Sequence, residues 1–158
     1  MHYYDEILAK VSGDIPTTDE VDKNLAWFRG LTQTQQVVFS THYLCCEVYN
    51  GGFHQYFHNS TGLTAPEAVE GFRVLGLGVL ASLVEEAMGV FGSDFPRERE
   101  VRQQFLDSIQ GDEPEQWNPF LLLDDRFYEM IRLPGAPPLS DDDRLSRAIE
   151  QLVGSAAS

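Results

Sequence analysis

Positive charge is scarce in this 158-residue chain, which has 11 Lys and Arg residues against 25 Asp and Glu residues and a formal net charge of −14. The phosphates of nucleic acids and anionic membrane surfaces repel a protein of this charge. The composition therefore argues against direct binding to nucleic acid or to a membrane. Basic proteins remain plausible partners, although an acidic surface can also serve solubility alone.

Long apolar runs and a basic leader segment are also missing. No stretch of 18 apolar residues occurs, and the N-terminal segment MHYYDEILAK lacks the basic and apolar regions of a secretion signal. Both cysteines, Cys45 and Cys46, are adjacent, and neighbouring side chains on a helix point about 100° apart, so no disulfide between them is expected. We expect buried free thiols and a cytoplasmic location.

Patterns for catalysis or cofactor binding are weak. The segment GLGVL, residues 76–80, follows no predicted strand and lacks the spacing of a phosphate-binding loop. His54 and His58 have the i, i+4 spacing of metal ligands on a helix, but neither the glutamate of the metalloprotease motif nor a Cys-x-x-Cys pair accompanies them. The cysteines lie in an apolar stripe, where structural thiols are expected. We therefore expect no metal, no cofactor and no enzymatic activity.

The most distinctive stretch is NGGFHQYFHN, which begins at Asn50. Two consecutive glycines are unfavourable within a helix, so Gly51 and Gly52 predict the end of the preceding helix. Asparagine tolerates a left-handed backbone and glycine adopts it without steric cost. A sharp turn and a restart of the helix at Phe53 are therefore predicted.

Aromatic residues dominate the second half of this motif. Phe53, Tyr56 and Phe57 recur at i, i+3 and i+4, which places three rings on one face of a short helix. Gln55 and Asn59 are expected to reach backbone groups exposed at the break. Two interpretations remain open: a structural corner whose rings fill the core, which an aromatic stripe favours, and a binding surface.

Helical periodicity covers most of the chain. In the first half of the chain the expected helices are 2–11, a segment from Thr17 or Thr18 to Gly30, 32–49 and the motif helix from Phe53. A longer helix is expected over 65–91, with a bend or split at Gly76 and Gly78. Three more are expected after it: a helix with Val101, Phe105 and Ile109 facing inward, a helix capped by Asp124 or Asp125, and a helix capped by Ser140. A short strand over 120–123 is the alternative at one point, but no second strand is available to pair with it. We predict an all-α fold, a single domain of residues 1–158 with about six to eight helices around a central apolar helix pair.

Charge is distributed unevenly along the chain. Glu47 is the only charged residue between Gly30 and Asn59, so this segment is predicted to lie at the centre of the domain, within a motif-bearing core of residues 32–91. Residues 1–33 hold six acidic and three basic residues, and residues 107–150 hold eleven acidic residues and four arginines. We expect both acidic stretches to form outer layers.

The motif also resembles a known signature. Asn50-Gly51-Gly52-Phe53, followed by Gln55, Tyr56, Phe57 and Asn59, is similar to the motif of a family of small bacterial proteins of unknown function, whose best-known member is an acidic DNA-mimic protein. The resemblance covers residues 32–150. It implies an all-helical fold and, for some members, binding to a DNA-binding protein in place of DNA.

The denser acidic stretch is the expected partner-binding surface, because an array of carboxylates can imitate the phosphates of DNA. The candidate residues are Asp112, Glu113, Glu115, Asp124, Asp125, Asp141, Asp142 and Asp143. The leading hypothesis is a DNA mimic that blocks the basic face of a DNA-binding protein or transcription factor. The alternatives are an immunity-type or other acidic interaction protein without DNA-like geometry, and an uncharacterised enzyme. A homodimer is left open.

Overall fold

A computed structural model describes residues 4–137 and 142–156 of the protein. Within these residues the chain forms nine α-helices, two 3-10 helices and no strand, so the predicted all-α fold is confirmed. In chain order the elements are α1 (Asp5–Ser12), α2 (Val21–Gly30), α3 (Gln33–His58), η1 (Ser60–Thr64), α4 (Ala65–Val74), α5 (Gly78–Met88), η2 (Gly89–Phe91), α6 (Arg99–Ser108), α7 (Pro114–Trp117), α8 (Leu121–Ile131) and α9 (Arg144–Ala156).

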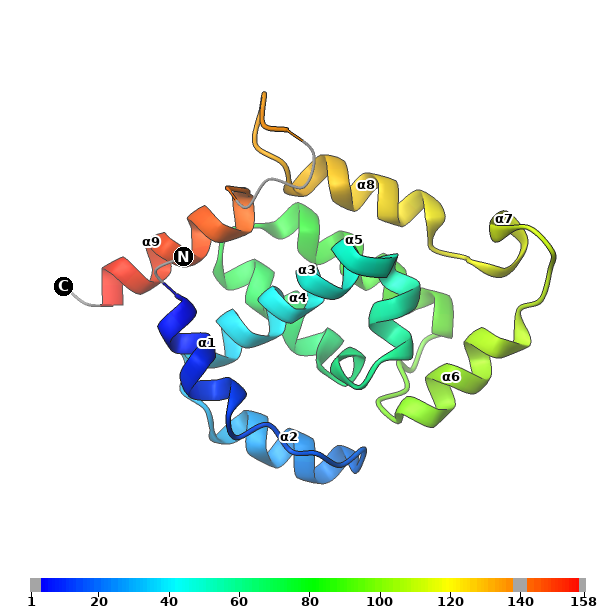
Figure 1. Cartoon of the computed structure of the whole chain (residues 1–158), viewed down its shortest axis with the longest axis horizontal. Coiled ribbons are helices and arrows are strands. Elements are labelled where there is room, and N and C mark those ends of the chain that lie inside the picture. Colours follow the sequence, from blue (N-terminus) through cyan, green and yellow to red (C-terminus); the bar gives the residue numbers. More distant parts are fainter. Residues whose placement is uncertain (1–3, 138–141, 157–158) are drawn as a thin grey trace.

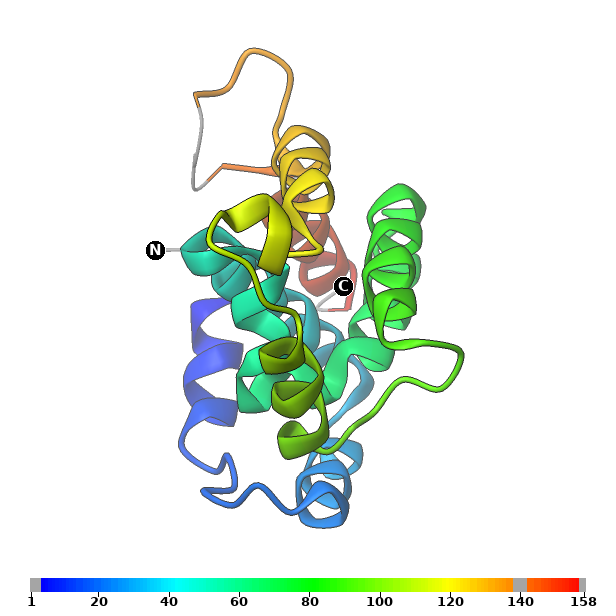
Figure 2. The same cartoon turned by 90° about the vertical axis from the view of Figure 1, so that its right-hand side faces the viewer.

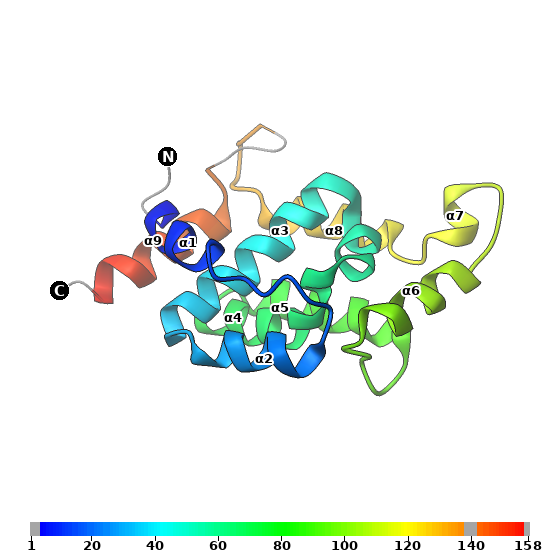
Figure 3. The same cartoon turned by 60° about the horizontal axis from the view of Figure 1, so that its bottom comes forward.

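Helix α3 is the central element, as its low charge predicted. It packs against α1, α4, α6, α8, α9 and η1. Helices α1 and α9 lie at one end of the molecule, and α6 and α7 lie at the opposite end (Figure 1). Figure 2 faces the α6–α7 end and shows α3 between α1 and α5, while Figure 3 shows α2 along one side of the molecule.

Phenylalanine side chains fill the core around the second half of α3. Phe57 is fully buried, and its ring centroid lies 5.1 Å from that of Phe91, 5.3 Å from that of Phe120 and 5.6 Å from that of Phe95. A smaller cluster of Val11, Phe28 and Phe39 holds α1 and α2 against the first half of α3. Burial of such large apolar side chains is the main stabilising term for this fold.

Two predicted helix starts have different outcomes. Thr32 begins α3 as expected: its hydroxyl accepts a hydrogen bond from Gln35 N, and the Gln35 side chain accepts one from Thr32 N. The predicted cap of α2 by Thr17 or Thr18 is wrong. The Thr18 hydroxyl instead accepts a hydrogen bond from Glu20 N at 3.2 Å, which forms a local turn, and α2 begins only at Val21.

The segment 65–91 is split, which was one of the two predicted outcomes. The backbone at Gly76 has φ 72°, a left-handed conformation that ends α4, and α5 begins at Gly78. A Cβ atom at either glycine would meet nothing within 4 Å, so these glycines do not serve the close approach of another backbone. The split reverses the chain and packs α5 against α4.

The predicted inward face of α6 is wrong at Val101. The Val101 side chain is 47% exposed, and Phe105 and Ile109 are half-buried, whereas Arg102 and Leu106 are fully buried. The helix is rotated because the Arg102 guanidinium is drawn inward to backbone carbonyl groups at the end of α3. An apolar spacing rule assigns a lone arginine to the solvent and so misses this rotation.

The acidic pair before Phe127 does not cap a helix. Helix α8 begins at Leu121, so Asp124 and Asp125 lie within it, and the alternative strand over 120–123 is also wrong. The last helix has a different cap from the predicted one. Ser140 lies outside the described residues, and Asp143 takes the capping role, because its Oδ1 accepts a hydrogen bond from Ser146 N at 2.8 Å.

The two cysteines are both free but differ in exposure. Cys45 is buried in the core, as predicted, whereas Cys46 is exposed, so the prediction of two buried thiols is wrong for Cys46. The Cys46 Sγ atom lies 3.3 Å from His42 Nε2 on the preceding turn. Burial is the main factor that raises the pKa of each thiol, so both are protonated at neutral pH.

Candidate protein-binding site

The break in α3 lies at the two glycines of the motif. Gly51 has φ −156° and ψ 26°, and Gly52 has φ 70° and ψ −177°, so the helical backbone is interrupted before Phe53 as predicted. The positive φ belongs to Gly52, and a Cβ atom there would also overlap the carboxylate of Asp124. Only glycine fits both the conformation and the space.

Asp124 supplies the hydrogen bond that the break requires. Its Oδ1 accepts from Phe53 N at 2.7 Å, and so the first exposed N–H group of the restarted helix is satisfied from α8. Tyr128, one turn further along α8, donates to Val48 O at 2.8 Å. Burial raises the pKa of Asp124 to about 6, partly opposed by the Phe53 hydrogen bond. Asp124 is therefore a buried structural residue and not the surface acid that we predicted.

Glu47 organises the polar side of the motif. Gln55 Nε2 and Asn59 Nδ2 donate to Glu47 Oε2 at 2.6 and 2.9 Å, and the Thr61 hydroxyl donates to Glu47 Oε1 at 3.3 Å. The prediction that Gln55 and Asn59 reach backbone groups is therefore wrong. The only charged residue of the central segment thus ties the first half of α3 to its second half and to η1.

Arg102 closes the C-terminal end of α3. Its Nε donates to Phe57 O at 2.8 Å and its Nη2 donates to Asn59 O at 2.9 Å, and its Nη1 contacts the carbonyl oxygen of Arg97. Burial lowers the pKa of Arg102 to about 10, so the side chain remains charged at neutral pH. A positive charge at a helix C-terminus is favourable, because the unpaired carbonyl groups there carry partial negative charge. No sequence pattern indicated this role.

The three motif rings are fully buried: Phe53, Tyr56 and Phe57 each have 0% exposure. Asn50 and Gly51 are exposed, whereas Gly52 is buried beneath α8. The rings therefore belong to the core, as the structural interpretation of the motif expected. A partner could contact this stretch only at the exposed Asn50 and Gly51 and at its half-buried polar side chains.

The predicted acidic surface divides into three groups. Asp112, Glu113, Glu115 and Asp125 are exposed, as predicted. Asp124 and Asp143 are buried at 7% and 6% exposure, which removes them from the surface. Asp142 is exposed but forms an ion pair with Arg147 at 2.8 Å, and Asp141 lies outside the described residues.

The burial of Asp143 has a specific cause. Asp143 caps α9 and also accepts a hydrogen bond from the Tyr49 hydroxyl of α3 at 3.1 Å. Its carboxylate therefore links α9 to the central helix α3. The pKa of Tyr49 is raised by burial first and by this carboxylate second. Neither of the two buried aspartates, Asp124 and Asp143, is available to a partner.

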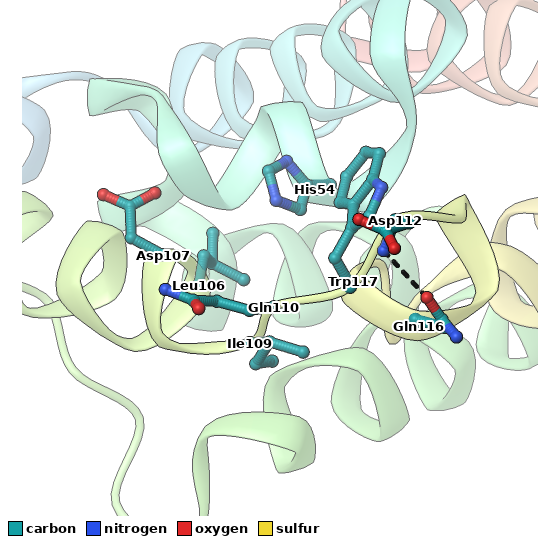
Figure 4. Close-up of a pocket in the computed structure, with 9 residues that line it drawn as sticks. His54, Leu106, Asp107, Ile109, Gln110, Asp112, Gln116 and Trp117 are labelled. Atoms are coloured by element: carbon teal, nitrogen blue, oxygen red, sulfur yellow. Dashed lines mark hydrogen bonds between the residues drawn. The ribbon is translucent and has the colours of Figure 1, made fainter.

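The exposed acids of α6 and α7 border an open cleft of about 780 Å³ (Figure 4). The cleft lies between the second half of α3, the end of α6 and α7. Its lining residues are His54, Leu106, Asp107, Ile109, Gln110, Gly111, Asp112, Gln116 and Trp117. The volume is within the range of small-molecule binding pockets. Sequence reasoning did not single out Asp107 or Trp117, because only the fold brings them to His54.

Gln116 holds the rim of this cleft. Its Oε1 accepts a hydrogen bond from Asp112 N at 2.8 Å (Figure 4) and another from Glu113 N at 3.1 Å. A Cβ atom at Gly111 would overlap the Gln116 side chain, so glycine permits this close approach. The Gln116 side chain therefore holds the acidic loop before α7 through two backbone N–H groups, and Asp112 and Glu113 are exposed.

His54 and Trp117 meet in the cleft. Their ring centroids are 5.2 Å apart with an interplanar angle of 83°, and the His54 ring is stacked on that of His58 at 6.2 Å. Burial and His58 lower the pKa of His54, whereas Asp107 raises it. His54 is therefore neutral at pH 7. Across the described ranges 4–137 and 142–156, no three His, Cys, Asp or Glu side chains are grouped so as to hold a metal ion.

Ion pairs neutralise many acids elsewhere on the molecule. Arg97 pairs with Glu67 at 2.8 Å, and Arg126 pairs with Glu86 at 2.8 Å. By contrast, no Lys or Arg occurs in residues 103–125, and none of the ion pairs between described residues includes an acid of this segment. Asp107 and Asp112, the two acids that line the cleft, therefore have no ion-pair partner among the described residues and no Lys or Arg within the segment 103–125.

None of the helices in the described part of the chain is long and apolar enough to cross a membrane.

Comparison with known proteins places the chain in a family. No curated protein and no solved structure matches the chain. The family model described as DMP19-like protein matches residues 29–151, which include the motif, the Asp124 and Arg102 contacts and the whole cleft. The chain therefore belongs to the DMP19-like protein family.

Proposed function

We propose that the protein is a non-catalytic binding module that occupies the basic, DNA-binding face of a DNA-binding protein. The observation that carries the proposal is a group of exposed acids at the α6–α7 end without a basic partner: Asp107 and Asp112 line the cleft, and Glu113 and Glu115 follow them in sequence. Carboxylates without basic neighbours attract Lys and Arg side chains of a partner, as the phosphates of DNA do.

Membership of the DMP19-like family supports the same proposal, since the resemblance described above connects this family with DNA mimicry. The architecture is compatible with a passive role. Polar side chains at the centre of the fold, Glu47, Arg102 and Asp124, are each engaged in hydrogen bonds that hold helices together. Binding through the surface then requires no rearrangement of the core.

One observation favours the alternative of an acidic interaction protein without DNA-like geometry. Asp124, Asp142 and Asp143 are buried or paired, so the negative surface is more localised than the sequence suggested. A localised acidic patch suits a partner that presents a few basic side chains as well as one that presents a whole DNA-binding face. The identity of the partner's contact face distinguishes the two.

The test uses affinity capture from the native host followed by binding measurements with two matched variants. The first carries Asp107→Asn, Asp112→Asn and Glu115→Gln, and the second carries Glu6→Gln, Asp14→Asn and Asp22→Asn. All six residues are exposed, and both variants lose three negative charges.

We expect the captured partner to be a basic DNA-binding protein. The cleft variant should bind it about 2 kcal/mol more weakly, while the control variant should bind nearly as tightly as the unmodified protein. Equal weakening in both variants would mean that net charge alone drives association. Retention of partners that bind no DNA would reject the proposal.

A further inference from the structure

We propose that the cleft between α3, α6 and α7 receives an arginine side chain of the partner, with the guanidinium against the Trp117 ring in a cleft whose acidic lining residues are Asp107 and Asp112. This inference rests on the proposed function, because it names the group that the same site recognises. Figure 4 shows Asp107 on the α6 side of the cleft, Trp117 and Asp112 on the α7 side, and His54 between Asp107 and Trp117.

The chemistry of the lining matches a planar cation. A guanidinium group stacks on an indole ring and donates paired hydrogen bonds to a carboxylate, whereas the ammonium group of lysine does neither as well. Leu106 and Ile109 add apolar surface against which the methylene groups of an arginine can pack. The lining thus combines an aromatic face, apolar walls and two acids.

The protein supplies no cation of its own to the cleft. No Lys or Arg lines it, and the nearest arginines along the chain are committed elsewhere. Arg102 is buried against Phe57 O and Asn59 O, and Arg126 is paired with Glu86. His54 is neutral at pH 7, so it does not oppose a bound cation. Asp107 and Asp112 are therefore open to a positively charged group of another molecule.

The probe is N-acetyl-arginine amide, and its uncharged isostere N-acetyl-citrulline amide is the control ligand. The indole N–H resonances provide a readout with an internal control, since the chain has two tryptophans and Trp27 packs on Phe39 in the smaller cluster. We expect the arginine probe to shift the Trp117 indole and His54 ring resonances with increasing concentration. The Trp27 resonance should not move, and the citrulline probe should move neither.

A double variant, Asp107→Asn with Asp112→Asn, should weaken binding of the arginine probe roughly fivefold or more, and Asp22→Asn on α2 should not change it. Trp117→Phe should weaken it less than Trp117→Ala. Equal shifts with the arginine and citrulline probes, or no shift at Trp117, would overturn the inference. If the probe binds in this way but capture returns no DNA-binding protein, the proposed function fails and the arginine site stands. If capture returns a DNA-binding protein but the probe does not bind in this way, the arginine site alone is rejected.

Discussion

The carboxylate of Asp124 and the backbone N–H of Phe53 form a hydrogen bond of 2.7 Å between residues that are 71 positions apart. This contact explains how a helix can be interrupted at the centre of the protein without leaving a buried N–H group unsatisfied. It also explains why α8 packs over the glycines of the motif, since Gly52 leaves the space that the carboxylate occupies.

Asp124 should give the protein a recognisable dependence of stability on pH. Its pKa is raised from 3.8 to about 6 in the folded protein, so the folded state binds this proton more tightly than the unfolded chain does. The stability contributed by this group is therefore greatest below about pH 4 and falls as the pH rises through about 6. Asp124→Asn retains an acceptor for Phe53 N–H and cannot ionise.

Urea unfolding of both proteins from pH 4 to 8 measures this effect. Relative to the unmodified protein, Asp124→Asn should gain free energy of unfolding as the pH rises through 6 and then stay level. Asp124→Ala should lose about 1–3 kcal/mol, because the N–H group is left unsatisfied. Parallel pH profiles for the unmodified protein and the Asn variant would show that Asp124 does not titrate in this range.

Gly52→Ala should destabilise the fold much more than Gly51→Ala. An alanine at Gly52 would have to adopt a φ of 70° and displace the Asp124 carboxylate, and a residue in such a backbone conformation costs about 1–3 kcal/mol before any overlap is counted. At Gly51 the φ is negative and the neighbouring group is the flexible Gln55 side chain. Thermal or chemical unfolding of the two variants tests the difference, and similar losses would contradict the assigned roles.

Phe57→Ala should reduce the free energy of unfolding by about 3 kcal/mol, because it leaves a cavity among Phe91, Phe95 and Phe120. Partner binding should fall only to the extent that folding falls. Chemical unfolding combined with binding measured under fully folding conditions separates the two effects. A Phe57 variant that remains folded and loses its partner would move the binding site to the motif.

Local sequence signals predicted much of the fold, since they depend on neighbours along the chain. Thr32 and Gln35 form a capping box, the stripe from Val37 to Val48 is buried, and the glycines break α3 where their backbone preference indicates. The inward turn of Arg102 was not predictable in this way. Its acceptors are carbonyl groups at the end of another helix, and no local pattern encodes them.

The candidate site was predicted less well than the fold, for the same reason. Composition identified the acidic segment, but burial of a carboxylate depends on its tertiary partner, which is Phe53 N–H for Asp124 and Tyr49 for Asp143. The cleft itself brings together His54 and Trp117, which are 63 positions apart in sequence. Periodicity within one helix contains no information about a contact between side chains of two different helices.

Association with the partner should weaken as salt is added. Carboxylates on the rim of the cleft attract basic side chains over a Debye length of about 10 Å at 0.1 M salt, so screening reduces both the association rate and the affinity. The folded protein lacks the dense counterion layer of a duplex. Its salt dependence should therefore be shallower than the loss of roughly a thousandfold or more that DNA binding can show between about 50 and 200 mM salt. Affinities at several salt concentrations, measured for both ligands on one partner, test this; an equal or steeper slope for the protein would argue against it.

Competition between this protein and duplex DNA for the captured partner shows whether both occupy the same face of that partner. A labelled duplex that carries the partner's binding site is titrated with the unmodified protein, with the Asp107/Asp112/Glu115 variant and with the Glu6/Asp14/Asp22 variant. We expect the unmodified protein and the control variant to release the duplex completely, and the cleft variant to require a concentration roughly thirtyfold higher, as a loss of about 2 kcal/mol implies. A stable complex that contains the partner, the duplex and this protein together would contradict this expectation.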